Sequence, residues 1–164
     1  MRRVVTHADL KKLADVSTSH FQLVDPALAD EAVVLRGDFS QLCLRDGLYL
    51  HATEVHELHD LKTQSVQGPS LTFSIFLQGR ISARIGERRF SLGRGAERSS
   101  QQFDATAISR ARPETFVRQS RTGAHIRKVN VTVTPEWLEN SGLDGAEDAA
   151  AVRRFARTHL AFGR

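Results

Sequence analysis

The sequence predicts a mainly β domain, a small sandwich or barrel with one short helix near its N-terminus and two helices near its C-terminus. Three observations support this fold class. Between residues 31 and 133 apolar and polar side chains mostly alternate, which is typical of strands. Turn dipeptides such as Asp46-Gly47 separate the alternating runs. After Thr134 the pattern changes to that of short helices.

Composition excludes several other classes. The chain has 164 residues, 40% hydrophobic and 26% charged, which indicates one globular domain rather than a disordered segment. Cys43 is the only cysteine, so neither an internal disulfide nor a cysteine-based zinc site can form. No apolar run is long enough for a transmembrane helix, and the N-terminus does not resemble a signal peptide. We therefore expect a cytoplasmic protein with no membrane contact.

The first predicted element is a short helix within residues 1–30. Thr6 can cap this helix, and Asp9 lies in its first turn near the positive end of the helix dipole. The helical pattern ends at Ser17, and Asp25-Pro26 marks a turn. Strands are then predicted at 32–35, 40–45 and 48–55, in a three-stranded meander over 71–92, and at 104–110, 115–121 and 125–133.

Two helices follow the last predicted strand. Thr134-Pro135 is a strong start signal for a helix over 135–141, because threonine caps helices and proline is favoured at the first helical position. Asp144 and Glu147 can form a capping box for a second helix that reaches about Leu160. A DNA-binding helix-turn-helix is an alternative for this pair, but the first helix is short and acidic. We favour two helices that pack against the β domain.

Positive charge is concentrated in one block. The chain carries a net charge of +4, whereas residues 80–128 alone carry 12 basic and 4 acidic side chains. In the meander, Arg80 and Arg84 lie on the face opposite to Ile81, Ala83 and Ile85. We interpret these arginines as a solvated outer sheet face that pairs with acidic residues. An anionic partner and direct contact with nucleic acid are the alternatives.

Histidines form the most suggestive cluster. His51, His56 and His59 lie within nine residues, with Glu54 and Glu57 between them. Imidazole and carboxylate groups can ligate transition metals, so a metal-dependent enzyme is one alternative. On a strand, however, His51 faces opposite to Glu54, and His56 and His59 share a face only if a bulge lies between them. These histidines can instead contact a ligand inside the barrel, or lie at the surface or in the core.

Part of the chain resembles a known family. The segment from Asp46-Gly47-Leu48-Tyr49-Leu50-His51 through His59-Asp60-Leu61 to Arg88-Arg89-Phe90-Ser91-Leu92-Gly93 is similar to the N-terminal regulatory domain of AraC-type bacterial transcription regulators. The stretch Val129-Asn130-Val131-Thr132-Val133-Thr134-Pro135-Glu136-Trp137-Leu138 also resembles this family, in which a final strand leads into a helix. The similarity is greatest to the branch that includes siderophore-responsive regulators.

The resemblance implies a cupin-like jelly-roll barrel that binds a small effector. It divides the chain into an N-terminal arm with a short helix (1–30), the effector-binding β barrel (31–133) and C-terminal helices (134–164). The helix-turn-helix domain of such regulators is absent, so we expect contact with DNA only through a domain that is not in this chain. The His-x-His motif of metal-binding cupins is also absent, and no metal or other cofactor is expected.

The resulting expectation is a non-enzymatic ligand-sensing domain that relays effector binding to the DNA-binding domain. The N-terminal arm is the candidate moving element, and a homodimer is left open. A metal-dependent cupin enzyme that uses His51, His56 and His59 is the main alternative, and a dimerisation module with a filled barrel is another. The expected effector contacts are aromatic or polar side chains on barrel strands: Tyr49, His51, Phe73, Phe76, Phe103 and His125.

Overall fold

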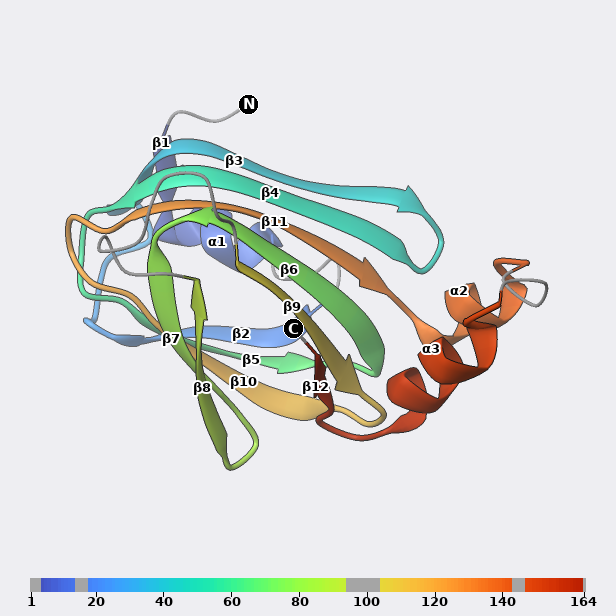
Figure 1. Cartoon of the computed structure of the whole chain (residues 1–164). Coiled ribbons are helices and arrows are strands. Elements are labelled where there is room, and N and C mark those ends of the chain that lie inside the picture. Colours follow the sequence, from blue (N-terminus) through green and yellow to red (C-terminus); the bar gives the residue numbers. More distant parts are fainter. Residues whose placement is uncertain (1–3, 14–17, 94–103, 143–146, 164) are drawn as a thin grey trace.

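A computed structural model describes residues 4–13, 18–93, 104–142 and 147–163, and within these residues the strands form two antiparallel sheets (Figure 1). The larger sheet has the order β1-β3-β4-β11-β6-β9-β12, and its strands are Val4–Thr6, Val33–Arg45, Leu48–Glu57, His125–Val133, Ser70–Gln78, Asp104–Arg110 and Phe162–Gly163. The smaller sheet has the order β2-β5-β10-β7-β8, with strands Thr18–Asp25, Lys62–Gln67, Glu114–Gln119, Arg80–Ile85 and Arg88–Gly93.

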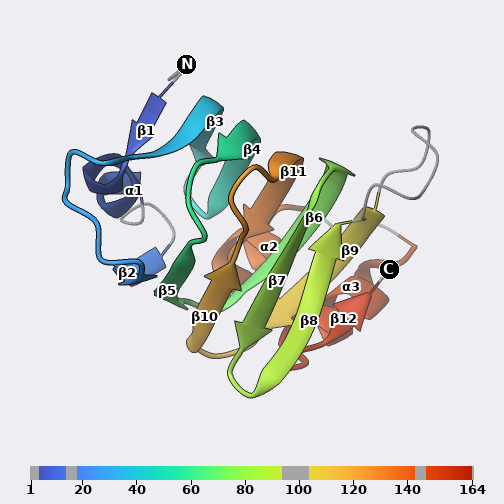
Figure 2. The same cartoon turned by 90° about the vertical axis from the view of Figure 1, so that its left-hand side faces the viewer.

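The two sheets lie face to face (Figure 2). This arrangement confirms the predicted mainly β fold of the jelly-roll type. The two ladders remain separate, however, so the domain is a sandwich rather than a closed barrel. Helix α1 (His7–Leu13) lies at the β1 edge, and α2 (Pro135–Asn140) and α3 (Ala149–Arg157) lie together at one end of the sandwich (Figure 1). None of the helices in the described ranges could cross a membrane.

The helix caps follow the sequence signals where the structure describes them. Thr6 Oγ1 accepts a hydrogen bond of 3.1 Å from the Asp9 amide, and Asp9 Oδ2 accepts one of 3.1 Å from the Thr6 amide, so the first cap is reciprocal. Thr134 Oγ1 accepts from the Trp137 amide at 3.2 Å. The capping box predicted at Asp144 lies outside the described residues, and α3 begins only at Ala149.

Four strands were not predicted: β1, β2, β5 and β12. Strand β5 reads Lys-Thr-Gln-Ser-Val-Gln and has almost no apolar side chains, so the hydrophobic pattern that indicates strands is missing there. Strand β3 runs without a break from Val33 to Arg45 through Gly37, where the prediction placed a gap. Gly37 has φ 131°, and a Cβ atom there would lie 2.2 Å from the Glu54 carbonyl oxygen, so only glycine fits this close approach between strands.

Apolar side chains gather in two clusters. The first lies between the sheets and consists of buried side chains such as Val55, Ile85 and Ile126. The second lies on the outer side of the larger sheet, where Leu138 of α2 packs on Leu71 and Val133, with Phe155 of α3 beside them. In the smaller sheet the apolar Ile81 and Ile85 face inward, as predicted. The predicted acidic partners of the outer arginines are not seen for Arg80, which donates to Ser91 Oγ at 3.0 Å.

Candidate functional site

A cavity of about 230 Å³ lies between the two sheets. Its walls come from the side chains of nine strands of the sandwich, and Phe21 of β2 and Leu10 of α1 complete them. This volume is slightly below the range of about 300–1,000 Å³ that is usual for small-molecule pockets. The interior is therefore not filled by bulky side chains, which argues against a module that only dimerises.

Cross-strand pairing builds the larger wall in regular rows. In the middle row, Gln41 of β3 pairs with His51 of β4, His51 with Asn130 of β11, and Asn130 with Ser74 of β6. The rows on either side of it are Phe39, Thr53, Lys128 and Phe76, and Tyr49, Thr132, Thr72 and Ile108. Most of these side chains are polar although they face the inside of a small domain. Such a polar interior is better suited to hold a bound molecule than to serve as an apolar core.

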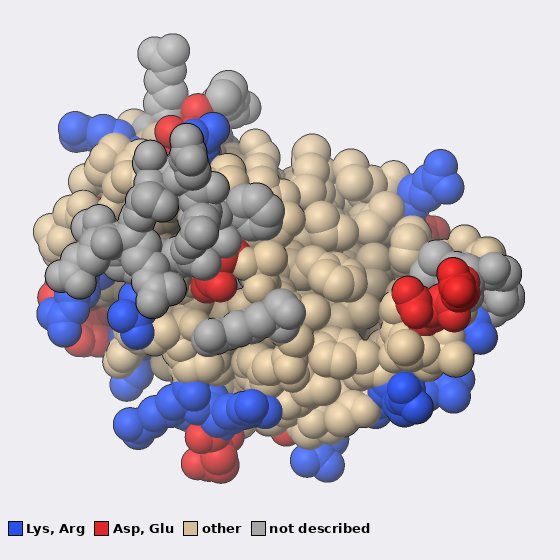
Figure 3. Space-filling view, in the orientation of Figure 1, with Lys and Arg blue, Asp and Glu red and all other residues tan. Residues whose placement is uncertain are grey.

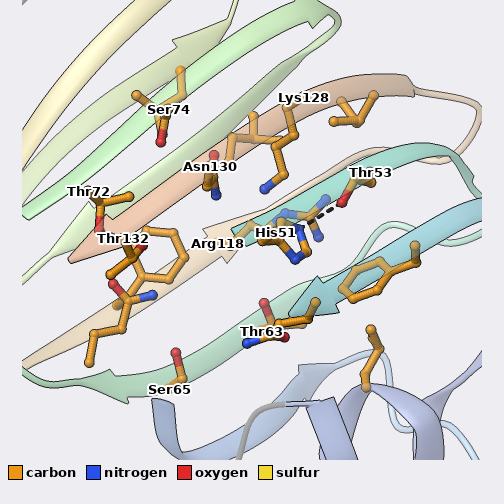
Figure 4. A pocket seen from close by; sticks show the side chains of 18 of the residues that line it. His51, Thr53, Thr63, Ser65, Thr72, Ser74, Arg118, Lys128, Asn130 and Thr132 are labelled. Atoms are coloured by element: carbon orange, nitrogen blue, oxygen red, sulfur yellow. Dashed lines mark hydrogen bonds between the residues drawn. The ribbon is translucent and has the colours of Figure 1, made fainter. Parts of the chain in front are cut away.

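The opposite wall comes from β5, β10 and β7. Thr63 and Ser65 of β5 point into the cavity and are buried (Figure 4). Arg118 of β10 pairs with Thr63 across the ladder, and Phe116 pairs with Ser65. Hydroxyl groups therefore line both walls and can donate or accept hydrogen bonds.

The cavity closes at one end and opens at the other. Along β4 the inward side chains change from buried at Val55 to half-buried at His51 and Tyr49. Along β11 they change in the same way from Ile126, which is fully buried, to Thr132. The open end therefore lies where β11 leads into α2 (Figure 1).

Charged groups also line the cavity. Glu57, which is fully buried, forms an ion pair with the guanidinium group of Arg118. Within the part of the chain that the structure describes, Glu57 Oε2 has no hydrogen-bond partner. Lys128 extends from the facing wall toward Arg118 and His51 (Figure 4). Burial, reinforced by the charge of Arg118 and opposed by that of Glu57, lowers the pKa of Lys128 from 10.5 to about 7.

His51 is a neutral group in this environment. Its Nε2 atom lies 2.7 Å from Thr53 Oγ1, and its ring packs edge-on against Phe39 with centroids 4.6 Å apart. Burial, followed by the charges of Lys128 and Arg118, lowers the pKa of His51 well below 6.5. His51 is therefore uncharged at pH 7 and can donate or accept a hydrogen bond from within the cavity.

Arg110 of β9 is buried beside the cavity. Its guanidinium group donates to Ser70 Oγ at 2.6 Å and to Thr72 Oγ1 at 3.2 Å. Burial lowers the pKa of Arg110 to about 10, so this side chain keeps its charge at pH 7. These hydrogen bonds hold Arg110 against β6.

The structure brings together some of the predicted contact residues. Tyr49, His51 and Phe76 all line the cavity. Phe73 does not: it lies on the outer face of β6 and is 42% exposed, because the strand presents Thr72 and Ser74 to the inside. Phe103 lies outside the described residues.

His125 also lies away from the cavity. It stacks on His56 across the outer face of the larger sheet, with ring centroids 4.3 Å apart. His59, in the loop after β4, has its Nε2 atom 3.2 Å from the Val33 carbonyl oxygen, whereas His51 points inward. The histidine trio considered as a metal site therefore does not converge, and the described residues contain no group of three metal-ligating side chains.

Sequence reasoning missed the polar residues that dominate the cavity, including Lys128, Arg118, Asn130 and Glu57. A signal for them was present. Lys128, Asn130 and Thr132 alternate with Val129 and Val131, which shows that one face of this strand is polar. An alternating strand can turn its polar face inward when a cavity lies there, and a pattern of period two does not indicate which face is inside.

Comparison with known proteins gives a family for the chain. The model of the family described as the N-terminal domain of the regulatory protein PchR matches residues 36–164. The crystal structure of the AraC-like transcriptional activator CuxR is similar at 12% identity and a TM-score of 0.49, over 93% of this chain and 48% of that one. The cupin domain of Cnp3 from Schizosaccharomyces pombe is similar at 11% identity and a TM-score of 0.40, over 90% and 97%. The chain thus spans about half the length of the activator. No curated protein sequence matches it.

Proposed function

Because the chain belongs to the family of the PchR N-terminal regulatory domain, we propose that its inter-sheet cavity binds a small effector and that binding regulates transcription. The observation that supports this proposal is the cavity itself, which is about 230 Å³ in volume and lined by hydroxyl, amide and charged groups. The role is one of binding rather than catalysis, and its expected location is the cytoplasm. The chain's contact with DNA is expected through a separate helix-turn-helix domain.

A thermal-shift screen of the 164-residue chain tests effector binding. The screen contains diverse small molecules, siderophores included, because a ligand that binds only the folded state raises the melting temperature. Ser74→Phe places a large side chain in the cavity, and Gln119→Phe makes the same change at an exposed position outside it. We expect hits that stabilise the natural chain and the Gln119 variant but not the Ser74 variant. A screen without hits, or hits unaffected by Ser74→Phe, would contradict the proposal.

The relay to other parts of the regulator is proposed to run through β9. Ile108 and Arg110 of this strand line the cavity, and Ser109 between them faces the other side. The Ser109 hydroxyl lies 2.8 and 2.9 Å from the carbonyl oxygens of Ala156 and Thr158, and the two oxygens share its single hydrogen. Strand β9 thus lines the cavity with one face and contacts the C-terminal end of α3 with the other. An effector acts by favouring one arrangement of these contacts over another.

Hydrogen exchange measures this relay. Saturation with a hit from the screen is expected to change amide protection in 149–163, beyond the change at the cavity strands, because those residues are held by β9. The N-terminal arm, residues 1–30, is the moving element expected from the resemblance, and the same measurement reports on it. Protection changes confined to the cavity strands would argue against a relay through β9.

We also propose that the chain forms a homodimer through the outer face of its larger sheet. Across this face one cross-strand row consists only of apolar side chains, and these are Leu42, Leu50, Val131, Phe73 and Ala107. Leu42 and Phe73 are 49% and 42% exposed. The middle of the face in Figure 3, over β11, β6 and β9, shows no charged side chains. Exposed apolar patches of this kind are typical of association sites.

Light scattering after size exclusion tests the dimer. We expect the natural chain to dimerise in a concentration-dependent manner and Phe73→Ser to shift it toward the monomer, while Gln119→Ser, at an exposed position on the other sheet, has no effect. A chain that stays monomeric at high concentration, or a Phe73 variant that dimerises as strongly as the natural chain, would contradict this assembly.

A further inference from the structure

The cavity carries more positive than negative charge. Among the described residues that line it, Glu57 is the only carboxylate, and Arg118 is its ion-pair partner. Arg110 is held separately by hydroxyl groups of β6. That leaves Lys128, which in the described part of the chain has no carboxylate within ion-pair distance. Lys128, like Arg110, is thus a cation of the cavity that no described carboxylate neutralises.

Lys128 is placed as a binding group rather than a surface group. It lies at the centre of the larger wall, between Thr53 and Phe76 in the same row, and its amine points into the cavity toward Arg118 (Figure 4). Its contact with the Phe76 ring is long, 5.7 Å to the centroid, which makes it a weak cation–π interaction. Two cations that face each other in a partly dehydrated space repel, and an anion between them removes that repulsion.

The residues around Lys128 indicate which other groups a ligand of this cavity would carry. Asn130 Oδ1 is buried and has no hydrogen-bond partner among the described residues, so it can accept from a donor on a bound molecule. Phe76 lies on the neighbouring strand, and Phe39 lies at the other end of the same row. A molecule with an acidic group, a nearby donor and an apolar body meets each of these features.

Resting on the proposed effector function, we infer that the cavity's ligand is a small organic anion whose carboxylate is bound by Lys128 beside Arg118, with its apolar part against Phe76 and Phe39. The cavity volume of about 230 Å³ excludes a macromolecule. The excess positive charge favours an anionic ligand over a neutral one. A neutral ligand would leave the buried ammonium group without a counter-charge, which costs free energy.

Pairs of probes that differ in charge test the inference. Each pair consists of a carboxylic acid and its primary amide, such as 2-naphthoate and 2-naphthamide, and dissociation constants are measured by calorimetry on the natural chain at pH 6. A charge-assisted hydrogen bond is stronger than a neutral one by enough to favour the acid by roughly tenfold or more. Lys128→Met removes the charge and keeps the bulk, and should abolish this preference. Arg80→Met, at an exposed arginine of the outer sheet face, is the matched control and should leave it unchanged.

The pH profile provides a second readout that an altered fold would not imitate. The carboxylate binds the protonated amine, so acid affinity should be about tenfold weaker at pH 8 than at pH 6, because the pKa of Lys128 is about 7 in the free domain. Lys128→Arg keeps its charge over this range and should lose the dependence. The other groups near the amine are His51, already neutral, and the Glu57–Arg118 pair. Asp104, in the row of Phe76, accepts from the Gly93 amide at 3.1 Å.

The outcomes separate this inference from the effector function itself. If neutral molecules bind in the cavity as strongly as their acids, or if Lys128→Met binds acids as well as the natural chain does, the anion assignment is wrong while effector binding stands. If neither acids, amides nor other screened molecules bind, the effector function fails first. Preference for the acids that depends on Lys128 but not on Arg80 supports the inference.

Discussion

Replacing Lys128 with methionine should stabilise the ligand-free domain. The natural side chain holds an ammonium group in a buried position whose pKa is about 7, compared with 10.5 for a solvated lysine. A depressed lysine pKa means that folding weakens proton binding. The unfolded state therefore binds more protons than the folded state between these two values, and the penalty is greatest at low pH. Methionine has a similar length and carries no charge, so it removes the penalty.

The expected size of the effect follows from that shift. One pKa unit corresponds to about 1.36 kcal/mol, so a shift from 10.5 to about 7 corresponds to at most about 5 kcal/mol below pH 7. Lys128 keeps some solvent-accessible surface inside the cavity, where water can relieve part of this cost. We expect a gain of on the order of 2 kcal/mol in the free energy of unfolding at pH 6. The gain should shrink as the pH rises from 7 toward 10, because the natural side chain then becomes neutral.

Urea unfolding at pH 6 and pH 9, followed by circular dichroism, measures this difference. The natural chain should gain stability relative to Lys128→Met between the two pH values, and Arg80→Met should run parallel to the natural chain at both. If Lys128→Met is less stable than the natural chain at pH 6, or if the difference does not change with pH, the ammonium group is not held at an energetic cost and the reasoning about the cavity charge fails.

Three further changes test other parts of the structure. Arg118→Met leaves the fully buried Glu57 without its partner and should cost about 3–5 kcal/mol in urea unfolding, and the double variant with Glu57→Gln should be markedly less destabilised; equal losses would show that the pair is not coupled. Gly47→Ala should destabilise more than Gly123→Ala, because both positions have φ near 80° but only at Gly47 would a Cβ atom meet another residue, 2.5 Å from Thr134 Oγ1; thermal unfolding that ranks them the other way would refute this contact. Ser109→Ala removes the hydroxyl that donates to the carbonyl oxygens of Ala156 and Thr158, so amide exchange in 158–163 should accelerate while exchange in β4 is unaffected. Unchanged exchange in 158–163 would show that this hydroxyl does not hold the segment.

The elements that could be predicted are those whose chemistry is local. Thr6 and Thr134 cap their helices through side-chain oxygens only three residues away, and Asp46-Gly47 defines a hairpin by its own backbone preference. The alternation of Ile81 and Ile85 with arginines correctly identified the buried face of β7, because arginine on that strand has no reason to face inward.

The elements that could not be predicted depend on contacts distant in sequence. Strand β5 has few apolar side chains and exists because β2 and β10 pair with it on either side. On β6 the apolar Phe73 suggested an inward face, yet Thr72 and Ser74 point inside. Strands usually turn their apolar side chains inward, but here the outer face is apolar and the cavity is polar. Only the pairing of β6 with β9 and β11 determines which of its side chains face the cavity. For the same reason, the sequence did not indicate that Lys128, which alternates with the valines of β11, faces the cavity.

A crystal structure of the chain with the tightest-binding molecule from the screen tests effector binding in the cavity most directly. We expect this molecule to lie between the two sheets, with an acidic group within hydrogen-bond distance of Lys128 Nζ and its apolar part against Phe76. A molecule bound on the outer face of the larger sheet, with the inter-sheet cavity unchanged from the free domain, would contradict the assignment of the cavity as the effector site.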